Sequence, residues 1–360
     1  MSDGIPCMIL RGGSSKGAYF LRDDLPRDPD ARDSLLRRVM GSPDARQIDG
    51  IGGAHPLTSK VAIVSSASDD AADVDYLFLQ VGVADDVVSD RQNCGNVLAG
   101  VGPFALERGL LTGPEHGECT VRIRMLNTDS IATARFAVLD GAPVYGGATA
   151  ISGVPGTAAA IHLDFEGLAG GSTGALLPTG NVVDTVEGTA CTLIDNGMPV
   201  AVLRADSLGV SGDETCAELE QDADLRAALE AIRLKAGELM GLGDVRETTV
   251  PKLTLVSPPS AGGHLSTRTF IPHRCHDAIG VLGAVSVATA ALLEGSPAHA
   301  CATAPGGDVV RLEHPTGCFD AVVEVDALAD GGVQVSRAGI IRTARKLMDG
   351  TVFPRVDTER

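Results

Sequence analysis

Short apolar runs rich in β-branched residues recur along the chain, and Gly, Pro, Asp or Asn bounds them. Runs of this length and composition are typical of strands. We therefore predict strands at residues 6–12, 61–65, 74–83, 120–125, 131–139, 190–194, 199–205, 253–256 and 321–325.

Two longer segments, residues 95–111 and 279–295, are apolar nearly all round and contain many small residues. A helix with this pattern is buried rather than amphipathic. Residues 213–240 instead carry charges on one side and apolar positions on the other, which predicts a surface helix with a structural role. Its expected apolar face consists of Leu219, Leu225, Leu229, Ile232 and Leu239.

The two halves of the chain resemble each other. The Pro-apolar-Leu-Arg pattern of residues 6–12 recurs at 199–205, and each copy precedes one of the apolar helices. Repeated patterns in the same order indicate related structural halves. We expect an α+β protein with two similar domains, each a mostly antiparallel sheet around one buried helix, the second beginning near Gly170.

Composition narrows the functional classes. The 360 residues suit two domains, and the formal net charge of −18 argues against nucleic acid as a partner. No apolar run is long enough to span a membrane, and the N-terminus lacks a signal-peptide pattern, so we expect a cytoplasmic protein. The eight cysteines form no CxxC pair and are expected to be reduced.

Two segments of the first half are candidates for anion binding and proton transfer. Residues 11–17 (RGGSSKG) form a Gly- and Ser-rich turn whose N–H groups could hold a carboxylate, or an ordinary hairpin turn. Lys60 opens an apolar strand, where desolvation would lower its pKa and make it a usable base. A Lys at a strand end can equally extend its amine into solvent.

Two further segments precede the apolar helices. Cys94 stands in Asn-Cys-Gly-Asn, where the start of a helix would stabilise a thiolate, although many cysteines are inert core residues. Before the second helix, Arg268 and Arg274 could bind carboxylates. His273, Cys275 and His276 match no usual zinc spacing, so anion binding or helix capping is favoured there over metal.

Together these motifs resemble the methylaconitate isomerase and 4-oxalomesaconate tautomerase family, which has the diaminopimelate epimerase-like fold. The motifs are RGGSSKG, LTSK, NCGN and PHRCH with the following GVLGAVSVA helix. The similarity also covers MGSPDARQIDG at 40–50, ALLPTGN at 175–181, IDNGMP at 194–199 and RTARKLMDG at 342–350, so it spans nearly the whole chain. The stretches at 40–53 and 101–111 look closest to the 4-oxalomesaconate branch, which serves gallate, protocatechuate and lignin-derived aromatic degradation.

The resemblance implies a first domain of residues 1–170, joined by 346–360, and a second of 171–345, with the active site in the cleft between them. It implies a cofactor-independent isomerase without a metal, whose partner is a small di- or tricarboxylate. In epimerases of this fold two cysteines act as acid and base. Here Cys94 matches the first, and Lys60 matches the lysine that replaces the second in the isomerase branch. The substrate-binding residues expected are Arg11, Gly12, Gly13, Ser14, Ser15, Lys16, Ser59, Asn93, Gly95, Asn96, Met198, Arg268, His273, Ile279 and Gly280.

Several alternatives stay open at this level. Isomerisation of 2-methylaconitate or methylitaconate would use the same framework, and a non-catalytic organic-acid binding protein would need the anion-binding turns alone. The sequence does not say which of Lys60 and Cys94 is the base. It also does not say in which direction the reaction runs or whether the chain forms a homodimer.

Overall fold

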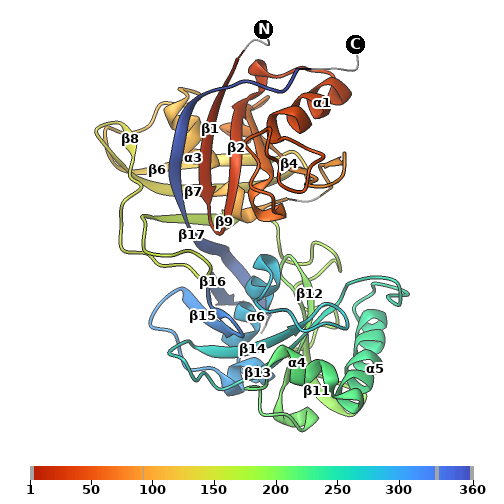
Figure 1. Cartoon of the computed structure of the whole chain (residues 1–360). Coiled ribbons are helices and arrows are strands. Elements are labelled where there is room, and N and C mark those ends of the chain that lie inside the picture. Colours follow the sequence, from red (N-terminus) through yellow and green to blue (C-terminus); the bar gives the residue numbers. More distant parts are fainter. Residues whose placement is uncertain (1–3, 92, 329–331, 357–360) are drawn as a thin grey trace. The chain divides into compact units, whose positions relative to one another are not determined.

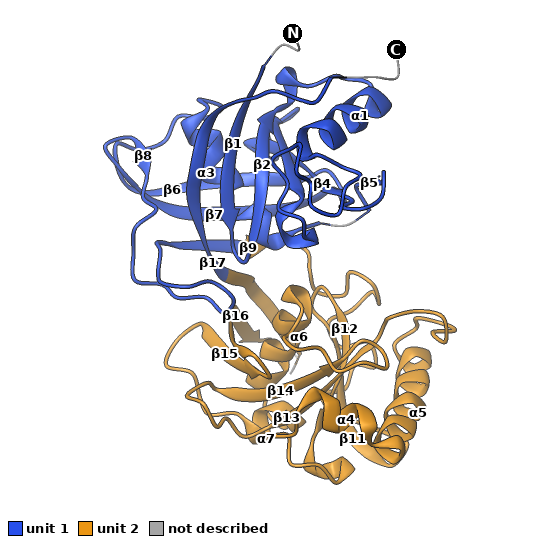
Figure 2. Cartoon of the chain, in the orientation of Figure 1, with its two compact units in different colours: residues 1–163, 341–360 blue, residues 164–340 orange. Residues whose placement is uncertain are grey.

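The computed structural model describes residues 4–91, 93–328 and 332–356. The chain forms two compact units, Met1–Leu163 with Ile341–Arg360, and Asp164–Ile340 (Figures 1 and 2). Gln92 and the last four residues, which belong to segments discussed above, lie outside the described residues. None of the helices in the described part of the chain has the length and apolar character needed to cross a bilayer.

The first unit is a mixed sheet in which antiparallel and parallel neighbours alternate. β1 pairs antiparallel with β2, β2 parallel with β3, β3 antiparallel with β4, β4 parallel with β6 and β6 antiparallel with β7. The C-terminal strand β17 returns to pair with β1. The elements are β1 (Ile5–Gly12), β2 (Ser15–Leu21), α1 (Pro29–Met40), β3 (Lys60–Ser66), β4 (Val74–Val81), β5 (Val88–Ser89), α2 (Gly95–Leu98), α3 (Val101–Glu107), β6 (His116–Met125), β7 (Ser130–Leu139) and β8 (Ala142–Pro143). The strands β9 (Ala160–Phe165) and β17 (Val333–Val352) each belong partly to the first unit and partly to the second.

The second unit repeats this alternation. β11 pairs antiparallel with β12, β12 parallel with β13, β13 antiparallel with β14, β14 parallel with β15 and β15 antiparallel with β16. Its elements are β10 (Asp184–Val186), β11 (Thr189–Asp195), β12 (Pro199–Arg204), α4 (Cys216–Gln221), α5 (Ala223–Leu239), β13 (Lys252–Ser257), β14 (Leu265–Phe270), α6 (Val281–Leu292), α7 (Pro297–Cys301), β15 (Val309–His314) and β16 (Gly317–Ala327). All the strands expected from the sequence are present.

The pairing order corrects the expected alignment of the two halves. β12 pairs antiparallel with the preceding strand β11 and parallel with β13, which follows α4 and α5. In the first unit β2 has the same two neighbours, because it pairs antiparallel with the preceding β1 and parallel with β3, which follows α1. Residues 199–205 therefore correspond to β2, and the Pro-apolar-Leu-Arg match with residues 6–12 is wrong by one strand. The similarity arose because buried strands of either position use the same apolar residues.

The sheet of each unit has two faces. Surface helices cover the outer face, and the inner face packs on the buried central helix, which is α2 with α3 in the first unit and α6 in the second. In the first unit Cys7, Phe20, Val61 and Ile63 pack with α1 in one core cluster. Side chains alternate along a strand, so Leu10, Tyr19 and Ala62 belong to the opposite, inner face. That inner face contacts α2 and α3, of which Val97, Leu98 and residues 101–105 are buried.

The helix expected at residues 95–111 is two short helices, α2 and α3, while the second apolar helix is continuous as α6. Tyr19 explains the break. Its hydroxyl donates to the carbonyl of Val97 at 2.6 Å, and a Cβ added at Gly100 would lie 2.4 Å from that hydroxyl oxygen. Glycine lets the backbone approach the buried ring, at the cost of helix continuity.

The surface helix expected at 213–240 is also two helices, α4 and α5, which meet at Asp222. Asp222 ends α4 and caps α5, because its side chain accepts from the Leu225 N–H at 2.8 Å. Leu219, Leu225, Leu229 and Ile232 are buried as expected, whereas Leu239 is 39 % exposed because the helix ends there.

Asp222→Ala removes this cap and leaves the first N–H groups of α5 without their side-chain acceptor. We expect a loss of about 1 kcal/mol in the free energy of unfolding, measured by urea denaturation. Asp224→Ala is the matched control, because Asp224 lies in the same first turn and makes no capping bond. Equal destabilisation by both substitutions would contradict the capping role.

Candidate active site

The turn between β1 and β2 lies directly against the start of α2. Gly13 has a φ of 52°, and a Cβ added there would lie 2.2 Å from Oδ1 of Asn96. Asn96 is held on both sides: its Nδ2 donates to Ser14 Oγ at 3.2 Å, and its Oδ1 accepts from Arg342 Nε at 3.0 Å. The Gly- and Ser-rich turn and the Asn-Cys-Gly-Asn segment are therefore one structural unit.

Lys60 begins β3 and is only 7 % exposed. Its Nζ donates to Gln80 Oε1 at 2.8 Å and lies 5.0 Å from the centroid of the Phe78 ring. The amide nitrogen of Gln80 donates to three main-chain carbonyls, those of Pro56, Ser59 and Val81. These bonds fix the orientation of the amide, so that its oxygen faces the lysine amine.

Cys94 is half-buried at the N-cap position of α2. This helix is a single turn, so the expected stabilisation of a thiolate by a long helix does not apply. Two tyrosines of the inner face lie within electrostatic range. Burial raises the pKa of Tyr19 and Tyr76 well above the ordinary value, and negative charge on the nearby Cys94 sulfur raises it further. Both phenols therefore stay protonated beside the thiol.

Buried polar atoms without a partner surround this segment. Among the described residues, nothing forms a hydrogen bond with Ser15 Oγ, Tyr76 OH or Asn93 Oδ1. The Asn93 amide is oriented by its other end, which donates to Thr128 Oγ1 at 2.6 Å. Because buried polar atoms are normally paired, each of these atoms needs a partner that the described side chains do not provide, such as water or a ligand.

Lys60 and Cys94 lie on the same side of the sheet. Val61 and Ile63 pack with α1, so Lys60 points to the inner face, and α2 contacts β1, β2 and β3 on that face. No hydrogen bond or ion pair connects Lys60 with Cys94 in the described parts of the chain. Gly12, Gly13, Ser14, Ser15, Asn93, Gly95 and Asn96 belong to the same inner-face cluster.

Three expected site residues direct their side chains elsewhere. Arg11 and Lys16 are cross-strand partners on the outer face, and Arg11 Nη1 donates to Gly13 O at 2.7 Å and to Thr343 O at 3.1 Å. The hydroxyl of Ser59 donates to Gln47 Oε1 at 2.8 Å. Arg11 and Ser59 therefore brace the turn and the preceding loop, with their polar groups turned away from the inner face.

In the second unit the turn between β11 and β12 packs on the central helix in the same way. Asn196 N donates to Ser286 Oγ at 3.0 Å, and that hydroxyl donates to Met198 O at 2.7 Å. Ile279, just before the start of α6, is buried, and Gly280 is exposed at the N-cap of that helix. Met198, Ile279 and Gly280 are thus gathered around the N-terminus of a twelve-residue helix.

Arg268 is directed to the other face of that sheet, and His273 lies in the turn after β14, beside α5. Arg268 is opposite Leu255, which packs in the core cluster of α4 and α5, and its Nε donates to Glu214 O at 2.8 Å. His273 Nδ1 lies 3.6 Å from Glu230 of α5. The sequence suggested that both residues join the helix start, because the segment lies just before α6; the strand alternation and these bonds place them otherwise.

Gln80, Tyr19 and Arg342 were not identified from the sequence, yet they hold Lys60, Val97 and Asn96. Gln80 could not be identified from its own segment, because it becomes the partner of Lys60 through the pairing of β3 with β4 alone. For Tyr19, only the alternation of side chains along β2 could have indicated a position on the inner face. Arg342 begins the RTARKLMDG segment of the family resemblance, but nothing in that segment indicates its bond to Asn96, which lies 246 residues away in the chain.

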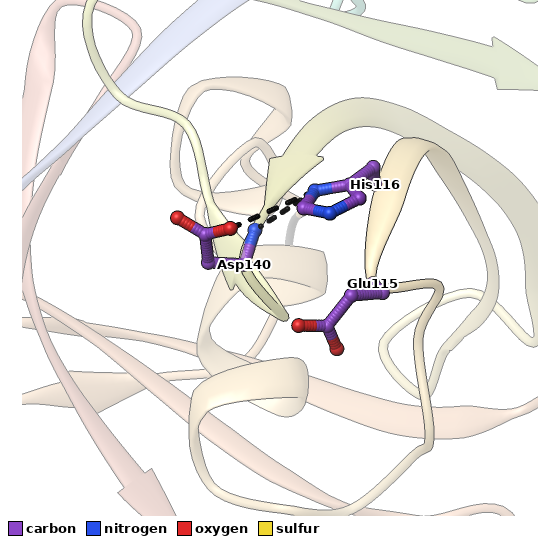
Figure 3. A group of neighbouring side chains, drawn as sticks. All are labelled: Glu115, His116 and Asp140. Atoms are coloured by element: carbon purple, nitrogen blue, oxygen red, sulfur yellow. Dashed lines mark hydrogen bonds and ion pairs between the residues drawn. The ribbon is translucent and has the colours of Figure 1, made fainter.

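Another group of side chains could in principle hold a cation. Glu115, His116 and Asp140 place one possible ligand atom each within 4.8 Å of one another (Figure 3). All three are exposed, and the His116 ring already accepts from the Asp140 N–H. Exposed acidic groups of this kind are common without an ion, so the cluster by itself carries no functional assignment.

Comparison with known proteins shows the family to which the chain belongs. It is 57 % identical over 353 residues to the (4E)-oxalomesaconate Delta-isomerase of Novosphingobium sp. (strain KA1), covering 98 % of both chains. It is 56 % identical to the 4-oxalomesaconate tautomerase of Pseudomonas putida, covering 98 % of this chain and 97 % of the relative. The crystal structure of methylitaconate-delta-isomerase superposes with a TM-score of 0.88 at 35 % identity, covering 98 % and 95 % of the two chains. Residues 3–355 match the family described as PrpF protein, and the chain is therefore a member of the PrpF family of isomerases.

Proposed function

We propose that this protein is an isomerase that moves a proton on 4-oxalomesaconate, without a cofactor, in the degradation of aromatic acids. The relatives that share more than half of its residues over nearly their whole length are named for this substrate. The observation on which the proposal rests is the inner-face cluster, where Lys60 and Cys94 accompany buried polar atoms that lack partners.

In the proposed reaction Lys60 or Cys94 removes a proton from a carbon next to the conjugated system. The other group returns a proton at the far end, giving a keto–enol or allylic shift. Ser15 and Tyr76 would supply hydroxyl donors to the negative charge that develops as the proton leaves. In the second unit we propose the N-terminus of α6, with Met198, Ile279 and Gly280, as a carboxylate-binding element.

A second candidate is isomerisation of methylitaconate, because the solved isomerase of that name has the same fold over nearly the whole chain. Turnover of the two substrates under identical conditions distinguishes the proposals. A higher kcat/KM for methylitaconate than for 4-oxalomesaconate would overturn the assignment of substrate but keep that of the reaction type.

Lys60→Met and Cys94→Ser each remove one proton-transferring group. We expect each to slow solvent-deuterium exchange into 4-oxalomesaconate by about 10²- to 10⁴-fold, measured by NMR. Lys235→Met on the exposed face of α5 and Cys216→Ser at the start of α4 are the matched controls. If both inner-face variants exchange at the wild-type rate, the site assignment is wrong.

Gln80→Leu and Gln80→Glu test the residue that orients Lys60. The leucine variant removes the acceptor at 2.8 Å, and we expect it to lower kcat by about tenfold or more. The glutamate variant places a negative charge beside the amine, which favours its charged form. The pH at which kcat/KM reaches half its maximum should then move upward. An unchanged pH profile with reduced activity would indicate a merely structural role for Gln80.

A further inference from the structure

A separate pocket of about 250 Å³ lies on the outer side of the first unit. Its floor is formed by Arg11, Thr343 and Arg345 of β1 and β17, and the loop at 145–158 forms its walls. Neither Lys60 nor Cys94 lines it. It is therefore a different feature from the inner-face cluster.

Two arginines face each other in this pocket without an acidic partner. Arg11 and Arg345 are directly opposite in the β1–β17 pairing, and Lys16 is opposite Arg11 on the other side. In the described parts of the chain, none of these three cations forms an ion pair, and no acidic residue lines the pocket. Like charges directly opposite each other in a sheet are destabilising, so this row costs the folded protein stability.

The protein leaves the positive charge of Arg11 largely uncompensated and partly shielded from water, so that a bound anion would relieve it. Arg11 is half-buried, and burial lowers its pKa, as does the neighbouring Arg345. Among the described residues, only Nη1 of its guanidinium forms hydrogen bonds, to Gly13 O and to Thr343 O and Oγ1. On a chain with a net charge of −18, an unpaired cationic pocket is a local exception that attracts anions.

The lining indicates the kind of anion. Thr149 and Thr157 bring hydroxyl groups, whereas Ile151, Val154 and Pro155 provide an apolar wall. Two guanidinium groups suit two carboxylates, each in the planar geometry that arginine prefers, and an apolar wall suits a short carbon chain. We propose that this pocket binds a small di- or tricarboxylate between Arg11 and Arg345, at a second site separate from Lys60 and Cys94.

A carboxylate bound in this pocket would also affect the β1–β2 turn, which carries Gly13 and Ser14 of the inner-face cluster. Arg11 and Thr343 both contact Gly13, since Gly13 N donates to Thr343 O at 2.8 Å and Gly13 O accepts from Arg11. Ser14 is also close to the loop, because a Cβ added at Gly153 would lie 3.5 Å from its Cβ. A bound carboxylate that neutralises the arginine pair would hold this turn and the loop together.

Isothermal titration calorimetry with tricarballylate, a saturated tricarboxylate, tests the proposal at low ionic strength. We expect Arg345→Glu to weaken one class of sites at least tenfold, and Lys60→Met to leave that class unchanged. Arg226→Glu, on the exposed side of α5, makes the same charge change elsewhere and is the control. Equal loss in the two glutamate variants, or the absence of any Arg345-dependent binding, would overturn the proposal.

Titration with inorganic phosphate distinguishes the source of the anion. Tighter Arg345-dependent binding of phosphate than of tricarballylate would overturn the carboxylate assignment. If Arg345→Glu fails to fold, Arg345→Gln replaces it. Without ligand we expect the glutamine variant to melt at or above the wild-type temperature, because it relieves repulsion with Arg11. A marked fall in melting temperature would show a structural role for Arg345 and contradict the proposal.

Discussion

The close approach of a helix start to a tight turn between two strands is the constraint on which the rest of each unit depends. In the first unit glycines at 12 and 13 leave room for Asn96, and the Tyr19 hydroxyl holds the Val97 carbonyl. In the second unit Ser286 links Asn196 to Met198 at the equivalent turn. Each of these bonds joins main chain to side chain in a buried environment, where an unpaired group would be costly.

This constraint explains why the candidate chemistry gathers where it does. Because α2 must begin against the β1–β2 turn, Asn93 and Cys94 reach the inner face of the sheet. The parallel pairing of β2 with β3 then puts Lys60 beside Gly17, and the partner strand β4 provides Gln80 and Phe78. Side chains alternate between the two faces of a strand, and those that pack with α1 are on the outer face. The remaining side chains of these strands are therefore on the inner face with Lys60 and Gln80.

The same alternation separates residues that are neighbours in sequence. Arg11 and Lys16 flank the turn but lie on the outer face, where Arg345 joins them. Arg268 and His273 precede α6 in sequence, yet they interact with the segment before α4 and with α5. Proximity along the chain therefore did not predict proximity in space for charged groups on strands.

The sequence by itself determined the strands, the buried character of the central helices and the four motifs that indicate the family, because these depend on local composition and periodicity. It also offered Lys60 and Cys94 as candidates, Cys94 from its Asn-Cys-Gly-Asn context and Lys60 from the family resemblance. Only the tertiary structure decided which strand of one half matches which of the other, where Tyr19 and Asp222 interrupt the helices, and that Gln80 and Arg342 support the site. Apart from the Asp222 cap, which is a local bond to the Leu225 N–H, those features arise from contacts between residues far apart in the chain, which the pattern of a single segment does not reveal.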